Sequence, residues 1–261
     1  MSRVLEGEPS PLEKAVPGVP SRQSQGQPQT RGLARVLTGL LLFGLSFGYV
    51  EAAVVAYLRP LYQPLHGRAA DDLFPLVTLQ QLAAAGSHYP RLLATELLRE
   101  AATLLMLAAV ALAAASNFRQ WFAAFLIAFG VWDIFFYVFL KVLLDWPASL
   151  LTWDLLFLLP VPWVGPVLAP VLVALAMIGS GVITLWREAD GRPIRLGWSH
   201  GAILVLGGLL IVTAFCWDYQ NILASGLPNP FNWPLFILGL AIGVGGFLHA
   251  LRLHLFLPPV N

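Results

Sequence analysis

Long apolar segments, separated by shorter polar ones, follow one another along most of the chain. Six of them approach the roughly 20 residues that an α-helix needs to cross a hydrocarbon core about 30 Å thick. We therefore predict an all-α, polytopic integral membrane helix bundle. Its six spanning helices are expected at about 33–58, 93–115, 120–144, 164–187, 199–217 and 234–254.

The stretch TWDLLFLLPVPWVGPVLAP, residues 152–170, interrupts this regular pattern. Thr152 is a suitable N-cap and Asp154 would lie in the first helical turn, where a carboxylate favours the positive helix end. Pro160 and Pro162 end such a helix at about residue 159, which leaves it about 11 Å long and too short to span. We predict a re-entrant half-helix near 152–160 on the outer side. A connector lying on the membrane surface is the alternative.

The N-terminal residues have a different composition. Residues 1–31 are rich in Pro, Gly, Ser and Gln and lack a periodic apolar pattern, which predicts a disordered tail. They do not resemble a secretory signal peptide, because the first apolar run starts late and is too long. Residues 32–257 are expected to form a single transmembrane domain.

The distribution of Lys and Arg predicts the orientation of the helices. With the N-terminus in the cytoplasm, ten of these residues lie on the inner side and five on the outer side or at outer helix ends. The short loop from Arg187 to Arg195 alone carries three arginines, which marks it as cytoplasmic. Six spans then place both termini in the cytoplasm, in a plasma membrane or a bacterial-type inner membrane.

Composition narrows the class of protein further. The chain is 58% hydrophobic and 11% charged, whereas a soluble domain carries roughly 25% charged residues. The lipid bilayer is the expected partner, and a homo-oligomer or a larger membrane complex remains open. No basic stripe supports binding of nucleic acid. Cys216 is the single cysteine, so a disulfide within the chain is excluded.

Ionisable side chains inside the predicted spans are the candidate functional groups, because they are costly in a membrane and face the bundle interior or a water-filled cavity. Most lie in the outer halves of the first three spans. The expected pocket residues are Glu51, Glu96, Arg99, Glu100, Asp133, Tyr137 and Lys141.

Helical spacing predicts that these side chains face the bundle interior. Gly44, Gly48 and Glu51 share one face of the first span, and small residues at this spacing let helices approach closely. Glu96, Arg99, Glu100 and Thr103 share a face of the second span, as do Asp133, Tyr137 and Lys141 in the third. We expect the three stripes to meet in an outward-facing polar pocket, covered by residues 59–92 and 145–165.

Each stripe also has a purely structural interpretation. Glu96 and Arg99 form a local ion pair in that interpretation, and Asp133 pairs with Lys141. Glu51 has no basic residue within a turn, so its partner is Arg99 or Lys141 from another helix, or else it is protonated. We interpret Asp145, Asp154 and Asp218 as acids at helix ends near the membrane surface.

Three hypotheses of function are compatible with this pattern. We favour a protein that handles a small solute or cation, as a transporter or channel does, since buried carboxylates and an interrupted helix suit coupling to cations or protons. An intramembrane enzyme is the alternative, with the carboxylates acting as acid and base or binding a divalent metal. No nucleophile motif, metal motif or cofactor motif supports it, and no catalytic residue is assigned. The third hypothesis is a structural subunit of a membrane complex.

Overall fold

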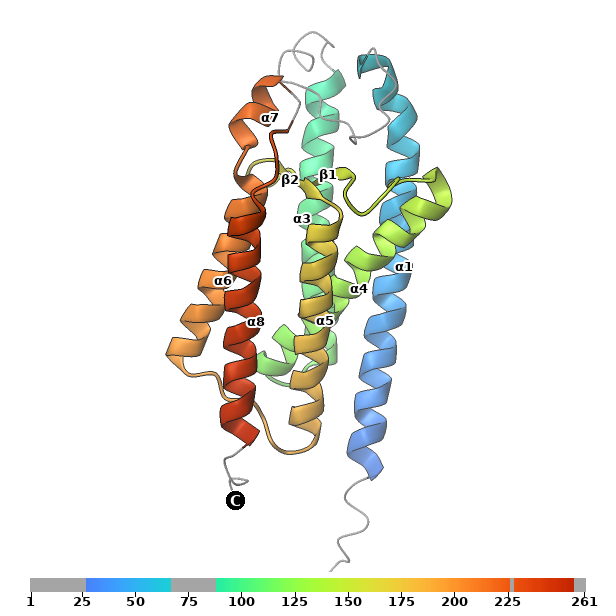
Figure 1. Cartoon of the computed structure of the whole chain (residues 1–261). Helices are drawn as coiled ribbons and strands as arrows, with labels where there is room; N and C mark the ends of the chain where they lie inside the picture. The colour runs from blue at the N-terminus through green and yellow to red at the C-terminus, as the bar shows by residue number, and fades with distance from the viewer. Residues whose placement is uncertain (1–26, 67–87, 226–227, 256–261) are drawn as a thin grey trace, which may run out of the picture.

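The computed structural model describes residues 27–66, 88–225 and 228–255 and shows a helix bundle with one small β-hairpin (Figure 1). The helices are α1 (Gln27–His66), α3 (His88–Ala114), α4 (Phe118–Leu144), α5 (Leu168–Ala189), α6 (Trp198–Cys216), α7 (Tyr219–Ser225) and α8 (Trp233–Leu255). The hairpin consists of β1 (Trp153–Phe157) and β2 (Trp163–Pro166).

Six helices in the described ranges are long and apolar enough to cross a membrane, and α7 is the short exception. The predicted number of spans is therefore confirmed, and the chain has the architecture of a multi-pass membrane protein. The start of α1 and the end of α8 lie at the same end of the bundle (Figure 1).

The first predicted span, at 33–58, agrees with the apolar part of α1, Gly32–Leu58. Helix α1 itself is longer and runs from Gln27 to His66, so residues 27–31, assigned to the tail, are helical. Residues 1–26 of the predicted tail and residues 67–87 of the predicted pocket cover lie outside the described residues.

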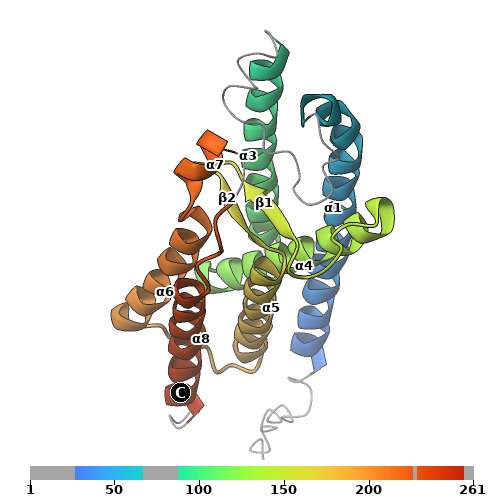
Figure 2. The same ribbon diagram turned by 45° about the horizontal axis from the view of Figure 1, so that its top comes forward.

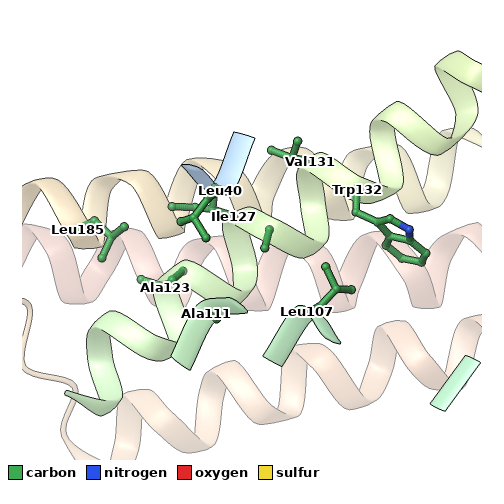
Figure 3. Packing of buried hydrophobic residues seen from close by; sticks show 10 residues of the cluster. Leu40, Leu107, Ala111, Ala123, Ile127, Val131, Trp132 and Leu185 are labelled. Atoms are coloured by element: carbon green, nitrogen blue, oxygen red, sulfur yellow. The ribbon is translucent and has the colours of Figure 1, made fainter. Parts of the chain in front are cut away.

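Helix α4 is the centre of the bundle and runs obliquely across it (Figures 1 and 2). One hydrophobic cluster joins α4 to three other helices (Figure 3). Its buried side chains include Ile127, Val131 and Trp132 of α4, Leu40 of α1, Leu107 and Ala111 of α3, and Leu185 of α5. Long apolar helices bury only part of their surface in such a core, because lipid can cover the remainder.

Close approach of α1 to α4 depends on two glycines. A Cβ atom added to Gly48 would lie 2.9 Å from the backbone nitrogen of Phe136 and 3.0 Å from the carbonyl oxygen of Trp132. At Gly44 the added atom would collide with the side chain of Val131. The predicted small-residue face of this span is thus confirmed, and it directs Glu51 into the bundle, where that side chain is buried.

Helices α6 and α8 form a second close pair. A Cβ atom on Gly207 would lie 2.7 Å from the backbone nitrogen of Gly243, and one on Gly239 would lie 2.9 Å from the carbonyl oxygen of Gly207. Near the opposite end of this pair from the hairpin, His200 Nε2 and His249 Nδ1 lie 3.2 Å apart.

The predicted half-helix at 152–160 is wrong, because Trp153–Phe157 form strand β1 of an antiparallel hairpin. Asp154 lies opposite Gly165 in the register, and the pairing is irregular between Leu155 and Phe157. Pro160 and Pro162 do end the regular segment, as expected, but here they turn the chain back on itself. A returning strand satisfies backbone N–H and C=O groups that a helix of seven residues would leave largely unpaired in an apolar setting.

The fourth span starts later in the sequence than predicted, because the hairpin includes the first predicted residues of this span. Residues 163–166 belong to β2, so α5 begins at Leu168 instead of 164. Gly165 is required at this point, because a Cβ atom would lie 2.9 Å from the ring of Phe215 and 3.1 Å from the ring of Phe231. The hairpin is thereby pressed against α6 and the segment that precedes α8.

Candidate functional site

Arg99 is the centre of the first polar group, which we call the Arg99 cluster and which consists of Glu51, Glu96, Arg99, Glu100 and Thr103. Its guanidinium is paired with Glu51 of α1, and its Nε donates to Glu96 Oε2 at 2.8 Å. Thr103 Oγ1 donates to Glu51 Oε2 at 3.4 Å. One cation therefore serves two carboxylates, and the pair between α1 and α3 joins helices that are otherwise in slight contact.

Glu100 links the Arg99 cluster to the hairpin. Its two carboxylate oxygens accept from the backbone N–H of Leu158, at 3.0 and 2.9 Å. Leu158 directly follows β1, where the backbone leaves the pairing with β2. A carboxylate that binds a backbone N–H in an apolar setting both satisfies that donor and fixes the position of the strand.

Asp133, Tyr137 and Asp154 form the second polar group, the Tyr137 cluster. Tyr137 lies one turn after Asp133 on α4, and its hydroxyl donates to Asp154 Oδ2 at 2.7 Å. All three residues are buried. Asp133 and Asp154 are close enough for their charges to repel.

Burial raises the pKa of the Asp154 carboxyl to about 6, even though the hydrogen bond from Tyr137 and one from the backbone of Leu155 favour its charged form. Asp154 lies in the hairpin, outside the spanning helices. Its proton is therefore exchanged near neutral pH, where an ordinary aspartate would be fully charged.

Asp133 differs from its neighbours in having no hydrogen-bond donor among the residues that the structure describes. Burying a carboxylate without a hydrogen-bond donor costs free energy, and in a membrane such a group usually faces the bundle interior or a water-filled cavity. Asp133 does line a cavity.

Lys141 does not join the other candidates. Its Nζ pairs with Asp145 Oδ1 at 2.7 Å, and half of the side chain is exposed. The interpretation of a pair between Lys141 and Asp133 is thus wrong. Asp145 ends α4 in the left-handed conformation, with φ 53°, which brings its backbone N–H to the carbonyl oxygen of Lys141 and its side chain to the lysine.

A cavity of about 1110 Å³ connects the two clusters. Its polar lining near the hairpin includes six of the seven residues selected from the sequence, all except Lys141, together with Asp154. Farther from the hairpin the lining is mostly apolar, and Ser180, Thr184, Arg119 and Arg195 follow at the opposite end.

Asp154 is the functional candidate that sequence reasoning missed, since its place after Thr152 suggested a helix cap. The structure pairs it with Tyr137, and its side chain is only 3% exposed. The one available signal was an acid in a segment too apolar for a surface loop. Asp218, by contrast, does have a local role, because it accepts from the backbone and side chain of Asn229 at 2.7 and 2.8 Å.

The described part of the chain contains no group of three or more His, Cys, Asp or Glu side chains arranged to hold a metal ion. Comparison with models of protein families, with characterised proteins and with solved structures finds no match to this chain in any of the three. Hypotheses of function therefore rest on the site itself.

Proposed function

We propose that this membrane protein binds a small cationic solute at the Tyr137 cluster and carries it across the membrane in the manner of a transporter. The observation that carries the proposal is the carboxylate of Asp133, which is buried and lines the cavity without a donor from the described residues. A cation is the natural partner for such a group.

The balance of charge in the cavity supports a cationic ligand. Five carboxylates line its hairpin end, and Arg99 is the one basic side chain there in the described part of the chain. That arginine already pairs with Glu51 and Glu96. Among the described residues, Asp133 and Asp154 therefore lack a nearby fixed cation, and protons or a bound cation must compensate their charge.

The length of the cavity supports transport. Lining residues of α5 extend from Pro170 to Thr184, which is about 20 Å at 1.5 Å per residue. Ser180 and Thr184 offer hydroxyl groups in the half of the cavity away from the hairpin.

We further propose that the hairpin end faces outward and that both termini are cytoplasmic. The arginines of the loop between α5 and α6 support this orientation, because short loops rich in arginine stay on the cytoplasmic side. The pocket then receives its ligand from outside the cell.

Charge movement in proteoliposomes tests the proposal. The purified chain is reconstituted and exposed to concentration jumps of protons, Na⁺, K⁺, ammonium, methylammonium and the organic cations tetraethylammonium and benzyltrimethylammonium on a solid-supported membrane. We expect a saturable current for at least one cation, its loss in Asp133→Asn and its retention in Asp145→Asn. The control makes the same chemical change at an exposed residue outside the cavity. Absence of current for every cation, or an undiminished current in Asp133→Asn, would contradict the proposal.

A further inference from the structure

The aromatic side chains around Asp133 identify the kind of cation that fits the cavity. Phe129, Phe136 and Tyr137 lie four positions before, three after and four after Asp133 on α4, so they share its face. All of them line the cavity. Aromatic faces attract organic cations, most strongly where water is excluded.

The aromatic surface continues beyond α4 onto the hairpin and α6. Phe129 contacts Trp132 at 5.2 Å between ring centroids, and it also contacts Phe157 of β1 at 6.4 Å. Phe157 contacts Trp163 of β2 at 5.6 Å, which stacks on Phe215 of α6 at 6.3 Å. We call these five rings the aromatic wall. Each of them lines the cavity.

A small inorganic ion does not match these surroundings. Metal ions such as Na⁺ and Ca²⁺ require several oxygen ligands around one point, and the described residues contain no group of three or more His, Cys, Asp or Glu side chains arranged to hold a metal ion. The cavity volume, about 1110 Å³, also exceeds the 300–1,000 Å³ typical of pockets that bind drug-sized organic molecules, so the cavity is far larger than a single small ion needs. The remaining lining is mostly apolar and would leave much of the shell of a hydrated ion without partners.

An anionic or neutral amphiphile does not match the charges. An anion would meet five carboxylates at the hairpin end, where Arg99 is already bound to two of them. A neutral molecule would leave Asp133 without compensation. The ligand that satisfies both the charge and the apolar surface is a cation with an apolar body.

We propose that the ligand is a lipophilic organic cation, with its charged centre against Asp133 and its apolar body against the aromatic wall. This inference rests on the proposed cation-binding function and adds the chemical class of the ligand. Leu240 and Val244 of α8 extend the apolar surface for the part of the ligand that lies beyond the rings.

Equilibrium binding of radiolabelled tetraphenylphosphonium to the full-length protein in detergent tests the inference. We expect saturable binding with one site per chain. Asp133→Asn should weaken it at least tenfold, Phe129→Leu about fivefold, and Asp145→Asn should leave it unchanged. Phe129→Leu removes the ring while keeping an apolar side chain, so it separates loss of the ring from loss of the fold.

Two competitors separate charge from apolar surface. A hundredfold excess of tetramethylammonium, which has the charge without the apolar body, should displace little of the probe. Triphenylphosphine oxide, which has the apolar body without the charge, should also displace little. Binding that does not saturate, or that is the same in Asp133→Asn, overturns the inference.

The results also distinguish this inference from the proposed function. If tetramethylammonium competes as well as the unlabelled probe, the ligand is a small cation, so the inference fails while cation binding stands. If the probe binds in a manner that depends on Asp133 but no cation moves charge in proteoliposomes, transport fails and the lipophilic-cation site stands.

Discussion

Replacing Arg99 should reveal how strongly the carboxylates around it depend on one cation. In Arg99→Gln, Glu51 and Glu96 both lose their ionic partner, and Glu51 is 7% exposed. Removing one member of a buried ion pair typically costs about 3–5 kcal/mol. The Arg99 side chain is 28% exposed, so we expect the lower end, about 3 kcal/mol.

The reason for this loss is an uncompensated charge, which a second substitution can remove. Glu51→Gln in the Arg99→Gln background leaves a neutral pair, so we expect it to recover about 1 kcal/mol or more. The same Glu51→Gln change in the otherwise unaltered protein should be destabilising instead, because it removes one of the two carboxylates that pair with Arg99. The sign of the effect of Glu51→Gln thus reverses with the residue at position 99.

Thermal unfolding of the four proteins in detergent measures this cycle. For a chain of this size, about 3 kcal/mol corresponds to a decrease in Tm of roughly 6–12 °C. Arg99→Lys is the matched control, since it keeps the charge and should lose much less. If Glu51→Gln destabilises both backgrounds equally, the two residues act independently and the ion pair contributes nothing.

Three other changes test the packing, the hairpin and the titration of Asp154. Gly48→Ala should destabilise the protein by about 1–3 kcal/mol in thermal unfolding, because its new methyl group meets backbone atoms of α4; Gly39→Ala on the same helix has open space and should be neutral. Glu100→Ala should speed amide hydrogen exchange at Leu158 at least tenfold, and unchanged exchange would show that this carboxylate does not hold the hairpin. The pKa of Asp154 in the folded protein is about 6, above its ordinary value of 3.8. The contribution of the protonated carboxyl to the free energy of unfolding is therefore fully present below about pH 4 and is lost as the pH rises through 6. The loss amounts to roughly 3 kcal/mol, at about 1.4 kcal/mol per pKa unit. Asp154→Asn should flatten this part of the stability profile, and an identical profile would refute the assignment.

The spans could be predicted from the sequence because membrane crossing is a local property. Length and apolar character within one segment are sufficient to indicate a spanning helix. The glycine face of α1 could also be predicted, since helical spacing alone places Gly44, Gly48 and Glu51 on one side. What helical spacing does not contain is the identity of the neighbouring helix.

The hairpin and its aspartate required information from distant parts of the chain. Thr152 and Asp154 match a helix start when considered alone, and the strand form is favoured only because residues 163–166 return to pair with it. Lys141 illustrates the same limit. It shares a helical stripe with Asp133, yet Asp145, four positions later, is its partner.

The bond between Glu100 and Leu158 has a consequence for the order in which the protein is made. Glu100 leaves the ribosome 58 residues before Leu158, so its carboxylate emerges before its backbone partner does. Until the hairpin is synthesised, a proton or water must satisfy those oxygens. In nascent chains halted before residue 158, α3 should therefore be less stably inserted in the bilayer than in chains that include the hairpin. The packing of α3 is complete only after α4 and the hairpin have been synthesised.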